Sequence, residues 1–177
     1  SNTVFQKIPS KNYDSVNNYG ESKSISYDKI KFFCRKYKLK YKSIYITNPW
    51  GPLEEKKLNH YLINNWIKNK NVFISHPRYV RDNIYIDKLS NIYSNLIDSK
   101  STKIDYFPSG YCSSNKVFIE AFKKKFEKFF NKKVKVAYAR KTNYSQPLIR
   151  INSKNIKKKI TIKENLDYYF DQYQYKL

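Results

Sequence analysis

Apolar residues repeat at helical spacing in four stretches of this chain. The period of about 3.6 predicts helices over residues 22–37, 58–66, 87–97 and 114–130. In the third, Asp87 is placed as the N-cap, because its side chain can accept hydrogen bonds from the first turn. The last stretch has the clearest apolar stripe, which consists of Val117, Phe118, Phe122, Phe126 and Phe129. We therefore expect this helix to lie against the core.

Runs of β-branched and aromatic residues separate these stretches. They predict short strands over residues 43–47, 72–74, 83–86, 104–107 and 134–138. Pro and Gly predict turns over 48–52 and 108–110, whereas residues 1–18 and the segment up to Pro147 have the composition of irregular loops. The end of the chain is expected to be a polar helix or tail. Strands that alternate with helices, without an internal repeat, indicate an α/β architecture.

Composition narrows the class of protein. With 177 residues, of which 40% are hydrophobic and 18% aromatic, the chain suits one globular domain or a piece of a larger one. No apolar run approaches the roughly 18 residues that a membrane helix needs, and no basic-then-apolar leader opens the sequence. These features predict a soluble, cytoplasmic protein with no membrane partner. Cys34 and Cys112 lie far apart and outside metal-ligand spacing, so we expect both to be buried and neither to bind a metal.

The charge is strongly positive, at +22, from 36 Lys and Arg against 14 Asp and Glu. Such an excess is typical of nucleic-acid-binding proteins, which gain affinity by releasing counterions. Here, however, most cations are lysines, and arginine is the better bidentate reader of phosphates. Lysine clusters at 36–40, 123–125 and 157–159 are therefore interpreted as solvated faces and loops, and nucleic-acid binding stays a minor alternative.

Tyr19 and Lys23 form a Tyr-x-x-x-Lys pair at the start of a predicted helix. Residues four apart share a helix face, so the phenol and the ammonium lie near each other. A neighbouring ammonium stabilises phenolate and lowers the pKa of the tyrosine, which suits acid-base chemistry. The alternative is an ordinary surface pair, since the chain is rich in both residue types.

Further segments follow this pair in a characteristic order. Tyr-Gly-x-Ser-Lys at 19–23, Asn-Pro-Trp-Gly-Pro at 48–52, Arg-Asp at 81–82 and Pro-Ser-Gly-Tyr at 108–111 precede Pro-Leu-Ile-Arg-Ile-Asn at 147–152. Over residues 19–154 the order resembles the extended short-chain dehydrogenase/reductases, in particular the NAD-dependent sugar-nucleotide epimerases and dehydratases. The resemblance implies the C-terminal half of a Rossmann-like parallel sheet, carried by residues 1–50, and a smaller α/β substrate-binding lobe in residues 51–177.

The resemblance also implies roles for individual residues. Tyr19 would be the catalytic acid/base, and Lys23 would hold the nicotinamide ribose and tune Tyr19. Thr3, or next Ser1, would be the third catalytic residue, although it lies closer to Tyr19 than is usual. Asn48 would contact the substrate's phosphate or sugar, Arg81 its diphosphate, and either Arg140 or Arg150 a second phosphate oxygen. The alternative for Arg81 is a local ion pair with Asp82 that braces a turn.

The chain departs from the family pattern in its glycines. Its three glycines, Gly20, Gly51 and Gly110, form no Gly-x-x-Gly-x-x-Gly loop, which such proteins use to hold the dinucleotide. We therefore expect NAD or NADP only in an intact protein and no cofactor on this chain alone. The chain would be a fragment, a truncated product, or a subunit completed by another chain, with exposed sheet edges and apolar helix faces that invite association.

Three functions follow in order of preference. The first is the substrate-binding portion of a sugar-nucleotide epimerase or dehydratase in surface-polysaccharide synthesis, which would use a keto-sugar intermediate. The second is a non-catalytic module for a nucleotide-diphosphate sugar or a partner subunit, and the third is a nucleic-acid-binding protein. The resemblance further implies a homodimer, with the helix at 22–37 in its interface.

Overall fold

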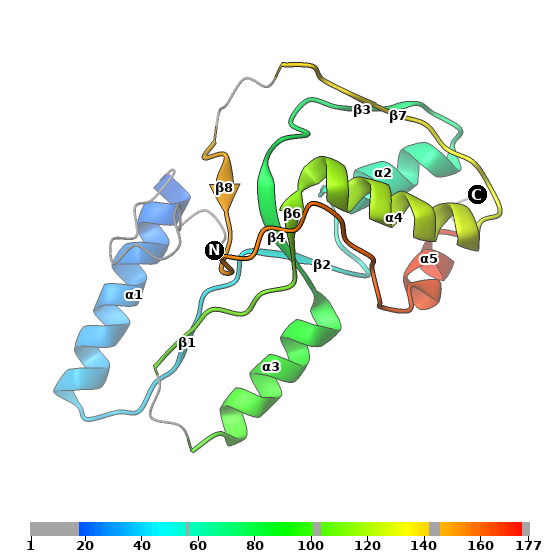
Figure 1. Ribbon diagram of the computed structural model, residues 1–177. Helices are drawn as coiled ribbons and strands as arrows, with labels where there is room; N and C mark the ends of the chain where they lie inside the picture. Colours follow the sequence, from blue (N-terminus) through cyan, green and yellow to red (C-terminus); the bar gives the residue numbers. More distant parts are fainter. Residues whose placement is uncertain (1–17, 56, 101–103, 142–145, 175–177) are drawn as a thin grey trace.

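The computed structural model describes residues 18–55, 57–100, 104–141 and 146–174 (Figure 1). The helices are α1 (Asn18–Lys36), α2 (Leu58–Ile67), α3 (Ile86–Asp98), α4 (Asn115–Phe129) and α5 (Asp167–Gln174). The strands are β1 (Ser43–Ile44), β2 (Asn48–Trp50), β3 (Val72–Ile74), β4 (Val80–Tyr85), β5 (Asp105–Tyr106), β6 (Tyr111–Ser114), β7 (Val136–Tyr138) and β8 (Ile149–Arg150). The α/β fold class predicted from the sequence is confirmed.

The strands form three sheets, and β4 is the centre of the largest. On one edge, β4 pairs with antiparallel β6. Its other edge pairs in parallel with β8 over Val80 and Arg81 and with β2 over residues 83–85. The parallel pairs β1 with β5 and β3 with β7 make the two remaining sheets. Strand β4 therefore joins segments that are far apart in the sequence, from β2 at residues 48–50 to β8 at residues 149–150.

An aromatic core lies among α2, α4, α5 and β2. Phe118, Phe122 and Phe126 recur every four residues along α4, and all three are almost fully buried. They pack with rings from each neighbouring element, namely Trp50, Trp66, Tyr169 and Phe170. Helix α4 begins at its N-cap Ser114, whose hydroxyl accepts a hydrogen bond from the Val117 amide at 3.3 Å. The predicted phenylalanine stripe is confirmed as a core-facing surface.

Helix α1 lies beside the β1–β5 pair (Figure 1), and several of its apolar side chains are exposed. Its contact with that pair is made by Tyr27, whose hydroxyl donates to Asp105 at 3.2 Å and whose ring meets Tyr45 edge-on. By contrast, Phe32 and Phe33 are 61% and 51% exposed. Cys112 is buried as predicted, whereas the same prediction is wrong for Cys34, which is half-buried on α1. None of the helices in the described ranges is long and apolar enough to span a bilayer.

Several predicted boundaries are wrong for identifiable reasons. Residues 48–50 were predicted as a turn but form β2, because Pro49 needs no amide hydrogen bond in a strand that pairs on one side with β4. The N-cap of α3 is Tyr85, and Asp87 lies inside the first turn. The end of the chain was predicted as a polar helix or tail, but α5 buries Tyr169, Phe170 and Tyr173 in the core.

Candidate functional site

Arg81 and Arg150 are register partners on the adjacent parallel strands β4 and β8. Register partners in a sheet project their side chains from the same face, so the two guanidinium groups are neighbours. Arg81 is buried, with 5% of its surface exposed, and Arg150 is half-buried. The sheet therefore holds two arginines that are adjacent and at least partly withdrawn from water.

Burial and mutual repulsion both act on this pair. Burial, and next the charge of Arg150, lower the pKa of Arg81 to about 10. Burial also lowers the pKa of Arg150, whereas Tyr79 opposes the shift in both residues. Among the described residues, no carboxylate forms an ion pair with Arg81. An anion bound here would relieve repulsion between the two cations and restore part of their lost hydration.

The alternative of a local Arg81–Asp82 ion pair is wrong, because consecutive strand residues point to opposite faces. Asp82 instead accepts hydrogen bonds from the backbone amides of Gly110, at 2.7 Å, and Asn152, at 3.1 Å. Arg81 turns to the other side, where its guanidinium carbon lies 4.4 Å from the centre of the Tyr79 ring.

The guanidinium of Arg81 is oriented by the segment that leads into β8. Its Nη1 donates to the carbonyl oxygens of Val80, Leu148 and Pro147 at 2.8, 3.1 and 3.3 Å. Its Nη2 reaches Gln146 Oε1 only at 3.5 Å and therefore retains capacity to donate to a ligand. No sequence pattern pointed to Gln146, whereas Tyr79 could have been found because it lies two positions before Arg81, directly before β4.

Asn48 lies next to the arginine pair on the same sheet. It is the register partner of Asn83 on β4, and its side-chain amide donates to Asn83 Oδ1. Asn83 is two residues beyond Arg81, so its side chain shares that face of the strand. The structure thus brings together Asn48, Arg81 and Arg150 from three of the strands.

The remaining predicted site residues lie elsewhere. Lys23 is exposed on α1, four residues after Tyr19, whose backbone belongs to the same helix. Arg140 is exposed just after β7 and is not on the sheet that holds Arg81. Thr3 and Ser1 lie outside the described residues. The geometry therefore favours Arg150 over Arg140 as the second arginine.

Two of the three glycines, Gly51 and Gly110, do not fit a dinucleotide cradle. A Cβ atom on Gly110 would collide with the backbone of Asn83 and Ile84, and one on Gly51 would collide with the side chain of Ile86. Both glycines thus permit close packing inside the protein, which leaves their backbone unavailable to a pyrophosphate. The described residues offer no glycine-rich site for NAD or NADP.

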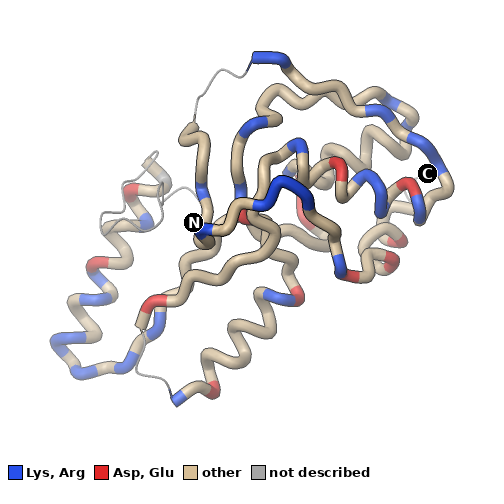
Figure 2. Tube along the Cα trace, in the orientation of Figure 1, with Lys and Arg blue, Asp and Glu red and all other residues tan. Residues whose placement is uncertain are grey.

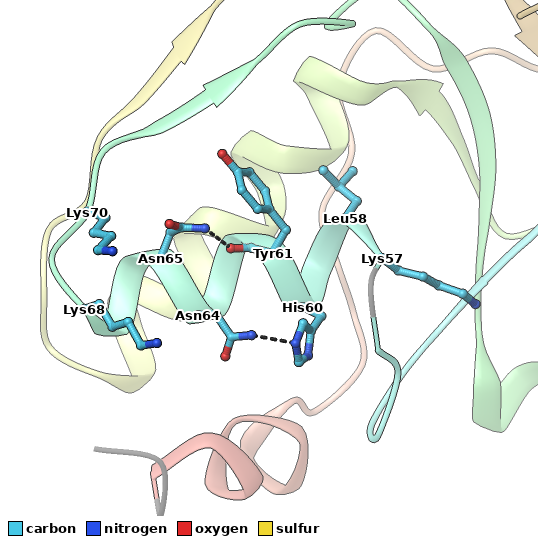
Figure 3. A pocket seen from close by; sticks show the side chains of 8 residues that line it. All are labelled: Lys57, Leu58, His60, Tyr61, Asn64, Asn65, Lys68 and Lys70. Carbon is cyan, nitrogen blue, oxygen red and sulfur yellow. Dashed lines mark hydrogen bonds between the residues drawn. The ribbon is translucent and has the colours of Figure 1, made fainter.

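A separate basic depression lies on α2 and has a volume of about 580 Å³ (Figure 3). Lys57, Lys68 and Lys70 line it, and all three are exposed. His60 faces Asn64 at 2.6 Å and Tyr173 of α5 at 3.3 Å, so its ring connects two helices. This depression is distinct from the arginine pair.

Solved structures share this fold at low sequence identity. The UDP-N-acetylglucosamine 4-epimerase of Methanobrevibacter ruminantium is 15% identical with a TM-score of 0.73, over 100% of this chain and 61% of that one. The UDP-glucuronic acid 4-epimerase of Bacillus cereus is 18% identical with a TM-score of 0.67, over 85% and 49%. The L-threonine 3-dehydrogenase of Trypanosoma brucei is 13% identical with a TM-score of 0.60, over 97% and 57%.

These likenesses establish a Rossmann-like α/β fold. The chain spans about half to three-fifths of the length of the solved structures it matches. No protein-family model and no curated protein matches the sequence. The same fold occurs in enzymes named for sugar nucleotides and in an enzyme named for an amino acid. The fold therefore does not identify the substrate class, which has to be argued from the site.

Proposed function

We propose that this chain is the substrate-binding part of an NAD(P)-dependent sugar-nucleotide epimerase or dehydratase. The observation that carries the proposal is the adjacent, desolvated pair Arg81 and Arg150. A diphosphate offers two charged groups a few ångströms apart, and planar guanidinium groups bind phosphate oxygens through paired hydrogen bonds. An amino-acid substrate would present one carboxylate, which needs only one of the two cations.

The neighbouring amides extend the same site. Asn48 lies beyond the arginines on the same sheet face, where its side-chain amide donates to the buried Asn83, and it can exchange further hydrogen bonds with hydroxyl groups of a sugar or ribose. The aromatic face of Tyr79 holds Arg81 from the side and thereby limits the positions that its guanidinium can take. The proposed order along the sheet is therefore diphosphate at the arginines and hydroxyl groups toward Asn48.

Proton transfer is assigned to Tyr19, with Lys23 as the residue that lowers its pKa. Their spacing of four residues on α1 supports this assignment, since it puts both on one helix face. Tyr19 would exchange a proton with a sugar hydroxyl, and Thr3 would orient that hydroxyl. Lys23 would hold the nicotinamide ribose of NAD or NADP, whereas the pyrophosphate would need residues other than Gly51 and Gly110, which are used in packing.

The poor fit between the glycines of this chain and a dinucleotide favours a second candidate function, a non-catalytic module that binds nucleotide sugars. It shares the arginine site and differs in having no turnover. The other proposals that the resemblance suggests are a homodimer through α1, which the exposed Phe32 and Phe33 support, a cytoplasmic location, and a role in surface-polysaccharide synthesis.

Calorimetric titration with three compounds tests the substrate class. We expect UDP-N-acetylglucosamine to bind at least tenfold more tightly than UMP, and N-acetylglucosamine alone to give no measurable heat. Equal affinity for UMP and the UDP-sugar would contradict a diphosphate site. In a protein that also contains the cofactor-binding segment, Tyr19→Phe should abolish turnover and preserve UDP-sugar binding, whereas the non-catalytic module would show no turnover before the substitution.

A further inference from the structure

Two lysine clusters that are far apart in the sequence line one groove. The groove lies between α4 and residues 158–162 and has a volume of about 380 Å³. One side carries Lys116, Lys124 and Lys128 from α4, and the other carries Lys158 and Lys159. Figure 2 shows the two basic segments passing close to each other. The sequence alone favours the interpretation that these two clusters are separate solvated surfaces.

The cations on both sides of the groove have few anionic neighbours. Lys124 and Lys128 are exposed one turn apart on α4, and Lys158 and Lys159 are exposed opposite them. Within the described ranges, the ion pairs at α4 join Glu127 to Lys123 and Lys133. Glu120, the one acidic residue lining the groove, already accepts a hydrogen bond from Tyr138 at 2.7 Å. The groove is therefore a concentrated positive surface.

The floor of the groove is apolar. Val117 and Ala121 of α4 face Ile160 and Ile162 across it. From Lys116 to Lys128 the helix rises about 18 Å, the length of a helix of about 12 residues. An occupant of that length could place apolar side chains on the floor and acidic side chains against both rows of lysines.

We propose that this groove docks an acidic amphipathic helix of a partner protein. Charge complementarity selects an acidic partner, because lysines line both sides of the groove. A nucleic-acid strand is disfavoured by the lining, which contains neither arginine nor an aromatic ring on which bases could stack. An apolar floor between charged rims instead matches the recognition of a helix in a groove. The inference does not depend on the proposed function.

The test uses the full chain and a synthetic 14-residue peptide of Leu and Glu, with Leu at helical spacing. Fluorescence anisotropy should show binding at least tenfold tighter than that of a scrambled peptide of the same composition. Lys124→Glu with Lys158→Glu should weaken binding at least tenfold. The matched control is Lys68→Glu with Lys70→Glu in the α2 depression, which changes the net charge by the same amount and should alter affinity less than twofold.

Three results would overturn the proposal. Equal binding of the scrambled peptide would show attraction by charge alone. Equal losses in the two double variants would show that the groove is not the binding surface. If a 14-nucleotide RNA bound more tightly than the Leu and Glu peptide, and if the groove variant lost this RNA binding, the groove would be assigned to nucleic acid. Circular dichroism of both variants, which should match that of the unaltered chain, separates lost binding from lost structure.

Discussion

Asp82 and Asn152 hold two distant parts of the chain together. Asp82 Oδ2 accepts a hydrogen bond from the Asn152 backbone amide at 3.1 Å, and the Asn152 side-chain amide donates to the carbonyl oxygens of Tyr45 and Pro108. The other carboxylate oxygen of Asp82 accepts from Gly110. One carboxylate and one amide thus fix the position of the segment that follows β8, and with it the position of Arg150.

Removing this carboxylate should destabilise the protein strongly. Asp82 is 0% exposed, so Asp82→Ala leaves buried amides of residues 110 and 152 without an acceptor. We expect a loss of about 3 kcal/mol in the free energy of unfolding, measured by urea denaturation. Asp87→Ala, at an exposed carboxylate in the first turn of α3, should cost less than about 1 kcal/mol. Similar losses in both variants would contradict the assigned role.

Two aromatic residues of α5 that lie two positions apart, Tyr168 and Phe170, should differ sharply in their contributions to stability. Phe170 is 1% exposed and packs against Phe122 and Phe126, whereas Tyr168 is 70% exposed. Phe170→Ala should lower the free energy of unfolding by about 3–5 kcal/mol, because it opens a cavity in the core. Tyr168→Ala should change it by less than about 0.5 kcal/mol. A small effect at Phe170 would show that α5 does not complete the core.

Stability should decrease with pH through the titration of Glu54. Burial raises the pKa of this carboxyl to about 7, although Lys57 and the Tyr169 hydroxyl oppose the shift. Because the folded state holds the proton more tightly, the stabilisation is fully present below about pH 4.5 and is lost as the pH rises through about 7.

The matched variants for this titration are Glu54→Gln and Glu55→Gln, the second at an exposed neighbouring carboxylate. At pH 8.5, Glu54→Gln should be more stable than the unaltered chain by about 1–3 kcal/mol, and at pH 4 the two should agree. Glu55→Gln should follow the unaltered chain at both pH values. Parallel pH profiles for all three proteins would rule out Glu54 as the cause.

Elements with a strong local pattern were predicted correctly from the sequence. Helix α4 was predictable because a Ser N-cap precedes phenylalanines at helical spacing. Strands β2, β6 and β8 were not, because each is stabilised by its register with β4, which no local pattern encodes. The burial of α5 was missed for a related reason, since its Tyr and Phe residues become a core face only when α4 lies against them.

The candidate site was predictable in part. Asn48, Arg81 and Arg150 were singled out by their order in the sequence, and the structure places them on one sheet. The choice between Arg140 and Arg150 needed the β4–β8 register, and the role of Asp82 needed contacts spanning up to 70 residues. The roles of Tyr19, Lys23 and Thr3 stay predictions.

The central claim is that Arg81 and Arg150 together bind a diphosphate, and calorimetric titration of UDP into matched variants tests it most directly. Arg150→Gln should weaken UDP binding at least tenfold, about 1.4 kcal/mol, because it removes one of two adjacent guanidinium groups. Arg140→Gln, which removes the same charge from an exposed position, should change the affinity less than twofold. Unchanged UDP affinity in Arg150→Gln, or equal losses in both variants, would contradict the account.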